Sequence, residues 1–216
     1  MIKWIKDFRK AYLTKTFRHF YSQHGEDIII KSILKNKKQG FFVDVGCYHP
    51  FRFSNTYLLY RRGWRGINID MEQHKINLFH IARKEDVNIT AAASDQVQEL
   101  YLHSQKRNDL GAHLSSDVNI SKETVTTKRL DDIIGTTKYK GRKIDLLSVD
   151  VEGHELQVLR SLDFSIYSPS VIIVELHSNS LSQIIESGIH HYLDSKHYNI
   201  RSFTPSNLIY SQGALN

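Results

Sequence analysis

The sequence predicts a single α/β domain built on a mostly parallel sheet, and three observations support this fold class. The chain has 216 residues, which is enough for one domain with a sizeable core. Short β-rich runs alternate with segments of helical length, the pattern of βαβ units. Acidic residues follow several of these runs, at the strand ends where parallel sheets bind their ligands.

The composition excludes several other classes of protein. Hydrophobic residues make up 40% and charged residues 24% of the chain, as in ordinary globular domains. No apolar run approaches the ~18 residues of a transmembrane helix, and the charged N-terminus lacks the apolar core of a secretory signal. The single cysteine, Cys47, cannot form an intramolecular disulfide, so a reducing, cytoplasmic setting is expected. The net charge of +6 permits an anionic partner without requiring one.

Residues 1–20 are predicted to form an amphipathic helix ahead of a main domain at residues 21–216. Apolar residues recur there near helical spacing, with lysines and arginines between them. Two interpretations remain open: the helix caps the domain, or it makes weak contact with an anionic membrane surface. The sequence does not indicate the oligomeric state.

The elements of the main domain follow in order. A first helix is predicted within residues 21–36, from an apolar stripe along that segment. Five strands are expected, at residues 40–46, 65–70, 87–94, 144–150 and 168–177. Helices are expected after the second and fourth of these strands, at residues 72–85 and 154–162. The tail is predicted to form an antiparallel hairpin over residues 198–212, and the polar stretch 104–127 to form a long loop of the kind that often acts as a lid.

Two acidic residues indicate a nucleoside-type ligand. Asp44 lies in VDVGCYHP, at the end of the first strand, and Gly46 permits a tight turn and close approach of a ligand. Asp70 ends the second strand, where a carboxylate holds ribose hydroxyls in βαβ folds. The first loop lacks G-x-G-x-x-G, which argues against a pyrophosphate cradle and an NAD-dependent oxidoreductase. Ser54 or Asn55 is expected to cap a short helix that faces this loop and could bind a carboxylate.

A second acidic cluster follows the fourth strand, in SVDVEGHE. Asp150 and His154 are candidate catalytic residues there, because a histidine can act as a base near neutral pH. Neighbouring glutamates have a simpler interpretation, which is that they favour a helix N-terminus. His177 and Glu175 end the fifth strand and are expected beside this cluster, where they could bind a hydroxyl or a metal. The spacing D-x-E-x-H is not a recognised metal signature, so no metal ligands are predicted.

These segments, in this order, resemble the FkbM methyltransferase family. The matching pieces are YSQHGEDIII, FFVDVGCYHP, SNTYLLYRRGWRGINID, AAASD, DLLSVDVEGHELQVLRSLDF and VIIVELH, which together span roughly residues 21–210. The resemblance implies a Rossmann-like class I methyltransferase fold, with a mostly parallel seven-stranded sheet, an antiparallel C-terminal strand and helices on both faces. It also implies S-adenosylmethionine as the cofactor and, in most members, O-methylation of a hydroxyl.

The resemblance and the local patterns together predict a set of cofactor-binding residues. Asp70 would hold the ribose, Met71 would flank the adenine, and Ser94 and Asp95 would lie beside it. The first loop departs from the family's commoner glycine-rich form, which leaves the contacts of the methionine end open. The full set of candidates is Gln23, Glu26, Asp44, Gly46, Cys47, Asn55, Asp70, Met71, Ser94, Asp95 and Asp150.

The leading functional hypothesis is methyl transfer to a hydroxyl of a glycan or another small molecule. His154 or His177 would take the proton, with Asp150 orienting the base. An RNA methyltransferase is an alternative, because Lys128 and Arg129 belong to a basic run that could meet phosphates. Few aromatic residues interleave that run, so no nucleic-acid partner is expected. A non-catalytic, methyltransferase-like binding domain is a further alternative, which the acidic residues argue against.

Overall fold

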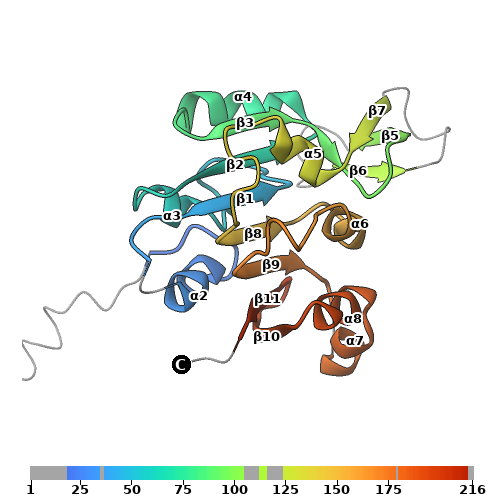
Figure 1. The fold of residues 1–216 in the computed structure, drawn as a ribbon. Coiled ribbons are helices and arrows are strands. Elements are labelled where there is room, and N and C mark those ends of the chain that lie inside the picture. Colours follow the sequence, from blue (N-terminus) through green and yellow to red (C-terminus); the bar gives the residue numbers. More distant parts are fainter. Residues whose placement is uncertain (1–18, 35–36, 105–111, 116–123, 179, 214–216) are drawn as a thin grey trace, which may run out of the picture.

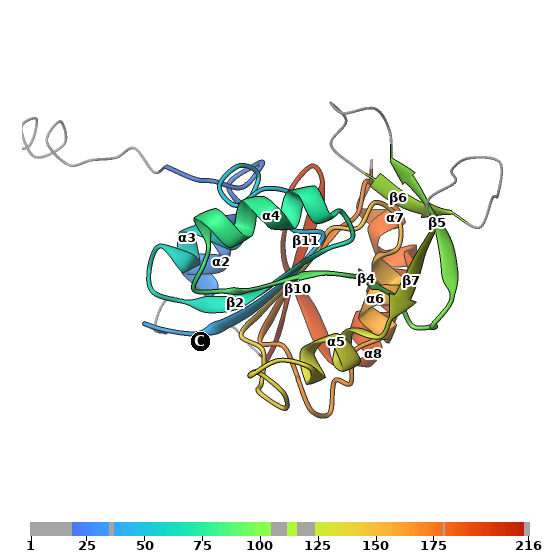
Figure 2. The same ribbon diagram turned by 90° about the horizontal axis from the view of Figure 1, so that it is seen from above.

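The computed structural model describes residues 19–34, 37–104, 112–115, 124–178 and 180–213. The described residues form one seven-stranded sheet with helices on both faces, together with a smaller sheet at one end (Figures 1 and 2). The helix predicted over residues 1–20 falls almost wholly outside the described residues and stays a prediction. Within the described ranges, every helix is too short or too polar to span a lipid bilayer.

The main sheet confirms the predicted fold class. Its spatial order is β10-β11-β9-β8-β1-β2-β3. The five strands from β9 to β3 are parallel, whereas β11 runs antiparallel to both of its neighbours. The tail therefore forms the predicted antiparallel hairpin. The strands are β1 (Phe41–Val45), β2 (Arg65–Asp70), β3 (Val87–Thr90), β8 (Leu146–Val149), β9 (Val171–Glu175), β10 (Tyr198–Phe203) and β11 (Asn207–Gln212).

The helices divide between the two faces of this sheet, as Figure 2 shows. One face carries α2 (Glu26–Ile33), α3 (Tyr57–Tyr60) and α4 (Gln73–Ala82). The other face carries α5 (Leu130–Gly135), α6 (Glu155–Arg160), α7 (Leu181–Glu186) and α8 (Gly188–Ser195). The strands from β9 to β3 are parallel to one another, so all of them end at the same edge of the sheet.

Alternation along β1 decides where its acidic residue points. Phe41, Val43 and Val45 pack into the core beneath α5 to α8. Phe42 faces the opposite way, into the core that contains residues of α2 and α3. Because successive side chains in a strand point to opposite faces, Asp44 shares the side of Phe42. That side brings its carboxylate to the segment that precedes α3.

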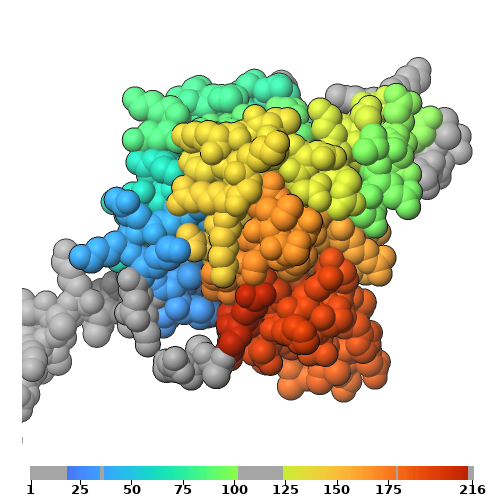
Figure 3. All heavy atoms as spheres, viewed as in Figure 1, coloured from blue at the N-terminus to red at the C-terminus, as the bar shows by residue number. Residues whose placement is uncertain are grey.

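The smaller sheet is the part of the fold that the sequence did not predict. Its order is β4-β7-β5-β6, and it projects from one end of the domain (Figures 1 and 3). The third predicted strand divides into β3 and β4, because β4 leaves the main sheet and pairs with β7. Part of the predicted loop 104–127 also forms strands. The strands of this sheet are β4 (Ala92–Ala93), β5 (Glu99–Ser104), β6 (Ala112–Ser115) and β7 (Thr124–Lys128).

Candidate functional site

A pocket opens where β1, β2, β8 and β9 end. The turns that follow β1 and β8 form its floor, and the segment before α3 forms one wall. Polar and acidic side chains alternate in it with small apolar ones from β2 and from residues 91–93. The polar lining consists of Gln23, Asp44, Ser54, Asn55, Asp70, Lys75, Ser148, Asp150, Glu152, His154, Glu175 and Asn207.

Gly46 allows the first turn to pass close to the second. Its φ of 78° lies in the left-handed region, which L-residues with side chains adopt at a cost. A Cβ at this position would stand 1.6 Å from the carbonyl oxygen of Asp150. The amides of Gly46 and Cys47 both donate to the Ile69 carbonyl, which ties the turn to the end of β2. Only glycine permits this packing of β1 against β8 at the pocket floor.

A buried polar network holds Asp44. The Thr56 hydroxyl donates to Asp44 Oδ2 at 2.7 Å, and Arg83 Nη1 donates to Thr56 Oγ1 at 2.8 Å. Arg83 is fully buried, and it also donates to Asn68 and lies over the rings of Phe42, Tyr57, Tyr60 and Phe79. Burial raises the pKa of Asp44, while the Thr56 hydrogen bond and the Arg83 charge oppose that rise. The Arg83 guanidinium therefore stabilises the Asp44 carboxylate through the Thr56 hydroxyl that lies between them.

Asp70 stands at the end of β2 and faces a lysine that the sequence analysis missed. The carboxylate accepts the Glu72 amide at 2.9 Å, so Asp70 caps the segment that leads into α4. Lys75 Nζ lies 3.6 Å from Asp70 Oδ2 and 2.6 Å from Glu72 Oε1. Burial raises the pKa of Asp70, and the Lys75 charge opposes that rise. Lys75 lies one turn into a helix of weak amphipathicity, so nothing in the sequence separated it from other surface lysines.

Asp150 and Glu175 form an acidic pair across neighbouring strand ends. Their side chains share a hydrogen bond, which shifts both pKa values and places one proton between the two carboxyls. Burial, the larger cause, raises both pKa values, and that of Glu175 reaches about 7. A carboxylate oxygen of Glu152 lies within 4.8 Å of both groups. A proton shared by Asp150 and Glu175 would relieve the repulsion between them, and a cation bound among the three carboxylates would do the same. The expected lack of metal ligands stays a prediction.

The turn after β8 is fixed by Glu155, whose role is structural. Glu155 Oε1 accepts the amides of Val151 and Gly153, at 3.2 and 2.9 Å. These bonds hold Glu152 at a positive φ of 56°. The turn presents Asp150 and Glu152 to the pocket and begins α6 directly afterwards.

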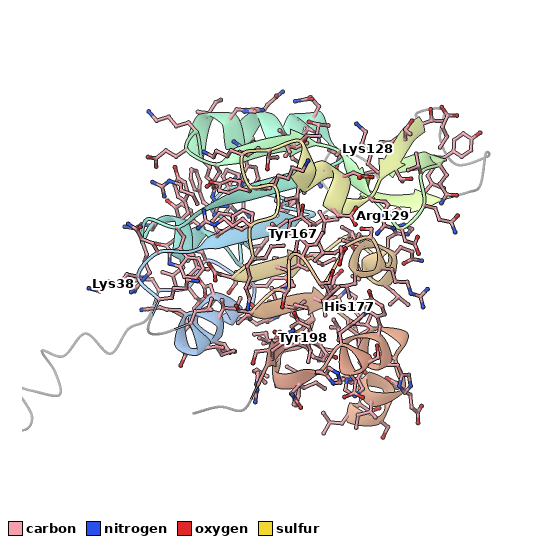
Figure 4. All side chains as sticks on the ribbon, viewed as in Figure 1. Lys38, Lys128, Arg129, Tyr167, His177 and Tyr198 are labelled. Carbon is pink, nitrogen blue, oxygen red and sulfur yellow. The ribbon has the colours of Figure 1, made fainter. Side chains whose placement is uncertain are left out.

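The two candidate histidines occupy different places. His154 lines the pocket, and its Nε2 lies 2.9 Å from Ser94 Oγ. Burial lowers the pKa of His154. His177 lies beyond the end of β9, outside the pocket lining, with its side chain 71% exposed (Figure 4). Its Nε2 nevertheless lies 3.1 Å from Glu175 Oε1, so it touches the acidic pair from outside.

The pocket gathers most of the candidate cofactor residues. Those in the lining are Gln23, Asp44, Gly46, Cys47, Asn55, Asp70, Met71 and Asp150. Ser94, Asp95 and Glu26 are not part of the lining. Ser94 contacts His154, and Glu26 accepts hydrogen bonds from Thr204 and Asn207. Burial alone would raise the pKa of Glu26, but these and neighbouring hydrogen bonds hold it below its ordinary value.

Asn207 is a second pocket residue that the sequence analysis missed. It is the first residue of β11 and pairs in register with Glu175. Its Nδ2 donates to Glu26 Oε1, whereas its buried Oδ1 has no hydrogen-bond partner among the described residues. A buried acceptor without a partner is costly, so this oxygen is suited to a donor on a bound ligand. Only the return of the chain along β11 brings Asn207 to this edge.

Two other predictions concern Cys47 and the basic run. The Cys47 thiol is buried, and burial raises its pKa well above the ordinary value, so it is unsuited to act as a nucleophile. In the basic run, Arg129 pairs with Asp131, and the Arg142 guanidinium lies over the rings of Phe41 and Tyr139. Lys128 ends β7 and Arg129 follows it; both are labelled in Figure 4.

The chain was compared with solved structures, curated proteins and family models. The solved structures of similar fold include a precorrin-6y C5,15-methyltransferase from Geobacter metallireducens, at 9% identity and a TM-score of 0.50 over 93% of this chain and 96% of that one. They also include a TehB-like SAM-dependent methyltransferase from Corynebacterium glutamicum, at 9% identity and a TM-score of 0.49 over 97% of both chains. The search of curated proteins gives no match. A family model described as the methyltransferase FkbM domain matches residues 44–205. The chain belongs to the FkbM methyltransferase family.

Proposed function

We propose that this methyltransferase uses S-adenosylmethionine, bound in the pocket at the ends of β1, β2 and β8. Asp70 offers a carboxylate where βαβ folds hold a ribose diol. The small side chains of residues 91–93 offer a flat apolar surface for the adenine. The unpaired Asn207 Oδ1 suits the ammonium group of the methionine end. Gly46 lets the turn after β1 pack against the Asp150 carbonyl beneath these groups.

We propose further that the acceptor is a hydroxyl group of a small molecule or glycan. Bound S-adenosylmethionine supplies an electrophilic methyl group: a carbon–oxygen bond forms, the carbon–sulfur bond breaks with its electron pair going to sulfur, and the hydroxyl proton is left to the protein. The protein must therefore align the hydroxyl and accept one proton. The observation that carries this proposal is that Asp70 and the Asp150–Glu175 pair line the same pocket.

The acidic pair is a better acceptor for that proton than His154. The His154 Nε2 is already engaged by Ser94 Oγ, on the side assigned to the adenine. The pair, in contrast, holds one proton between two carboxyls, and the pKa of Glu175 stands at about 7. A base whose pKa lies near the working pH is efficient in both accepting and releasing a proton. The His154→Ala variant should then keep most of its turnover. If His154 were the base instead, the same variant should lose roughly 100-fold or more of its turnover.

The test combines binding and turnover. Calorimetric titration of the protein with S-adenosylhomocysteine should give a one-to-one complex. Turnover with labelled S-adenosylmethionine is then measured against a panel of hydroxyl-bearing sugars, other small molecules and RNA. Label in an ether product supports the proposal. Cofactor binding with no methylated product from any hydroxyl acceptor would favour the non-catalytic alternative, and label in RNA bases would favour the nucleic-acid alternative.

A further inference from the structure

The acidic pair continues outward to the protein surface through His177. Asp150 lines the pocket and shares a hydrogen bond with Glu175. Glu175 also lines the pocket, with a side chain that is 12% exposed, and its Oε1 lies 3.1 Å from His177 Nε2. The His177 side chain is 71% exposed and stands outside the pocket lining. The three residues therefore form a hydrogen-bonded row from the pocket to solvent.

The chemistry of the row suits movement of a proton in one direction. Each turnover leaves one proton in a pocket that the cofactor and acceptor fill, so direct access to water is reduced. When Asp150 holds the proton shared with Glu175, its other oxygen is free to accept. A proton that arrives there releases Asp150's own proton toward Glu175 along the existing bond. Imidazole is the side chain best suited to pass it on near neutral pH, because it exchanges protons with water in that range.

We propose that His177, acting through Glu175, is the exit relay for the proton that methyl transfer releases at Asp150. The proton of the acceptor hydroxyl goes to Asp150, the proton of Asp150 goes to Glu175, and His177 Nε2 takes it from Glu175 Oε1 and gives it to water. The proton leaves the pocket, and once the Asp150 carboxyl has turned its new proton toward Glu175, the pair is again singly protonated with one negative charge. This inference rests on the proposed function, and it makes His177 a relay that touches neither cofactor nor acceptor.

The groups around the relay set its pH dependence. Glu175 faces Asp150 and Glu152 from the turn after β8, and Glu155 from the start of α6. It also faces His177 just beyond the end of β9 and the uncharged Asn207 from β11. Burial first, and then the negative charge of Glu152, raises the pKa of Glu175 to about 7. The relay is therefore open only above about pH 7, where Glu175 is ionised.

The first measurement uses the protein without ligand. Infrared difference spectra recorded across the pH range should show a carboxylic-acid band that disappears near pH 7, and Glu175→Gln should remove it. The matched control is Glu186→Gln on the exposed face of α7, which should leave the band unchanged. A wild-type spectrum with no titrating acid band near pH 7 would overturn the relay, whatever the enzyme's activity.

The second measurement is turnover with rescue. His177→Ala should lower kcat by at least ~10-fold with little change in KM, and added imidazole should restore most of it. His80→Ala, at an exposed position on α4, is the control and should change neither value. Calorimetry with S-adenosylhomocysteine should give wild-type affinity for both variants.

The outcomes separate the two proposals. Loss of kcat in His177→Ala with imidazole rescue and normal affinity supports the relay. Wild-type kcat in His177→Ala at every pH, or a loss that imidazole does not restore, would overturn it while the methyltransferase proposal stands. Failure of the wild-type protein to bind S-adenosylhomocysteine would instead overturn the proposed function on which the relay rests.

Discussion

The carbonyl oxygen of Asp150 occupies the space where a side chain on Gly46 would begin. An added Cβ would lie 1.6 Å from that oxygen, and φ at Gly46 is 78°. Two parallel strands that both carry acidic residues are thereby brought together at one pocket floor. The contact joins the turn after β1 to the turn after β8 that carries Asp150 of the acidic pair. A change in one turn therefore displaces the other.

Gly46→Ala should therefore both destabilise the protein and abolish cofactor binding. The left-handed backbone alone costs a residue with a side chain about 1–2 kcal/mol, and the overlap with the Asp150 carbonyl adds to this. Thermal unfolding and calorimetry with S-adenosylhomocysteine measure the two effects. Gly63→Ala is the matched control, because Gly63 also has a positive φ but an added Cβ meets nothing within 4 Å. Equal losses of affinity in both variants would contradict this role for Gly46.

Asp70→Asn should weaken cofactor binding more than it weakens folding. The amide oxygen can still accept the Glu72 amide, so the cap before α4 is kept. The charge that would strengthen hydrogen bonds from a ribose diol is lost, and hydrogen bonds to charged groups contribute about 1.5–3 kcal/mol. We expect a fall in S-adenosylhomocysteine affinity of about 10-fold or more, with an unfolding temperature near that of the wild type. Unchanged affinity would remove Asp70 from the ribose site.

Arg83→Met should destabilise the fold strongly, because it leaves Asp44 in a buried site without the nearby positive charge. Breaking a buried charged pair typically costs about 3–5 kcal/mol. Thr56→Val removes the hydroxyl between the two groups but keeps both charges, so its cost should be smaller, about 1–3 kcal/mol. Denaturant unfolding measures both variants. A smaller effect for Arg83→Met than for Thr56→Val would show that the guanidinium does not support Asp44.

The stability of the protein should depend on pH through Glu175. Its pKa in the folded state is about 7, above the ordinary value of 4.5, so the folded protein holds a proton that the unfolded chain releases between these values. Stability contributed by this group is therefore present at low pH and is lost as pH rises toward 7. Glu175→Gln should raise the unfolding temperature relative to wild type more at pH 8 than at pH 5. The same difference at both pH values would mean that Glu175 does not titrate in this range.

Activity should not require a divalent metal ion. A proton shared by Asp150 and Glu175 offsets the repulsion between these carboxyls, and the singly protonated pair keeps one carboxylate that can act as the base. After exhaustive treatment with a chelator, turnover should remain at the wild-type level. Recovery of activity on addition of magnesium alone would show that a cation takes the place of that proton.

The sequence determined the fold class and the main acidic residues of the site. The alternation of β-rich and helical segments predicts the parallel sheet, because the period of apolar residues reflects which face each element buries. Asp44, Asp70 and Asp150 were found because each directly follows or ends a strand, and parallel strands end at one edge. These relationships are local in the chain, so a single sequence contains them.

Tertiary structure alone decided which side chains meet. Asn207 reaches the pocket because β11 returns antiparallel beside β9, and Arg83 reaches Asp44 across Thr56 from the end of α4. The two histidines also take different places at this edge of the sheet: His154 lies inside the pocket and His177 lies outside it. Strand pairing sets these distances between residues far apart in the sequence, and side-chain type alone does not encode them. Burial and hydrogen bonding then raise the pKa of Glu175 to about 7, which no property of an isolated glutamate predicts.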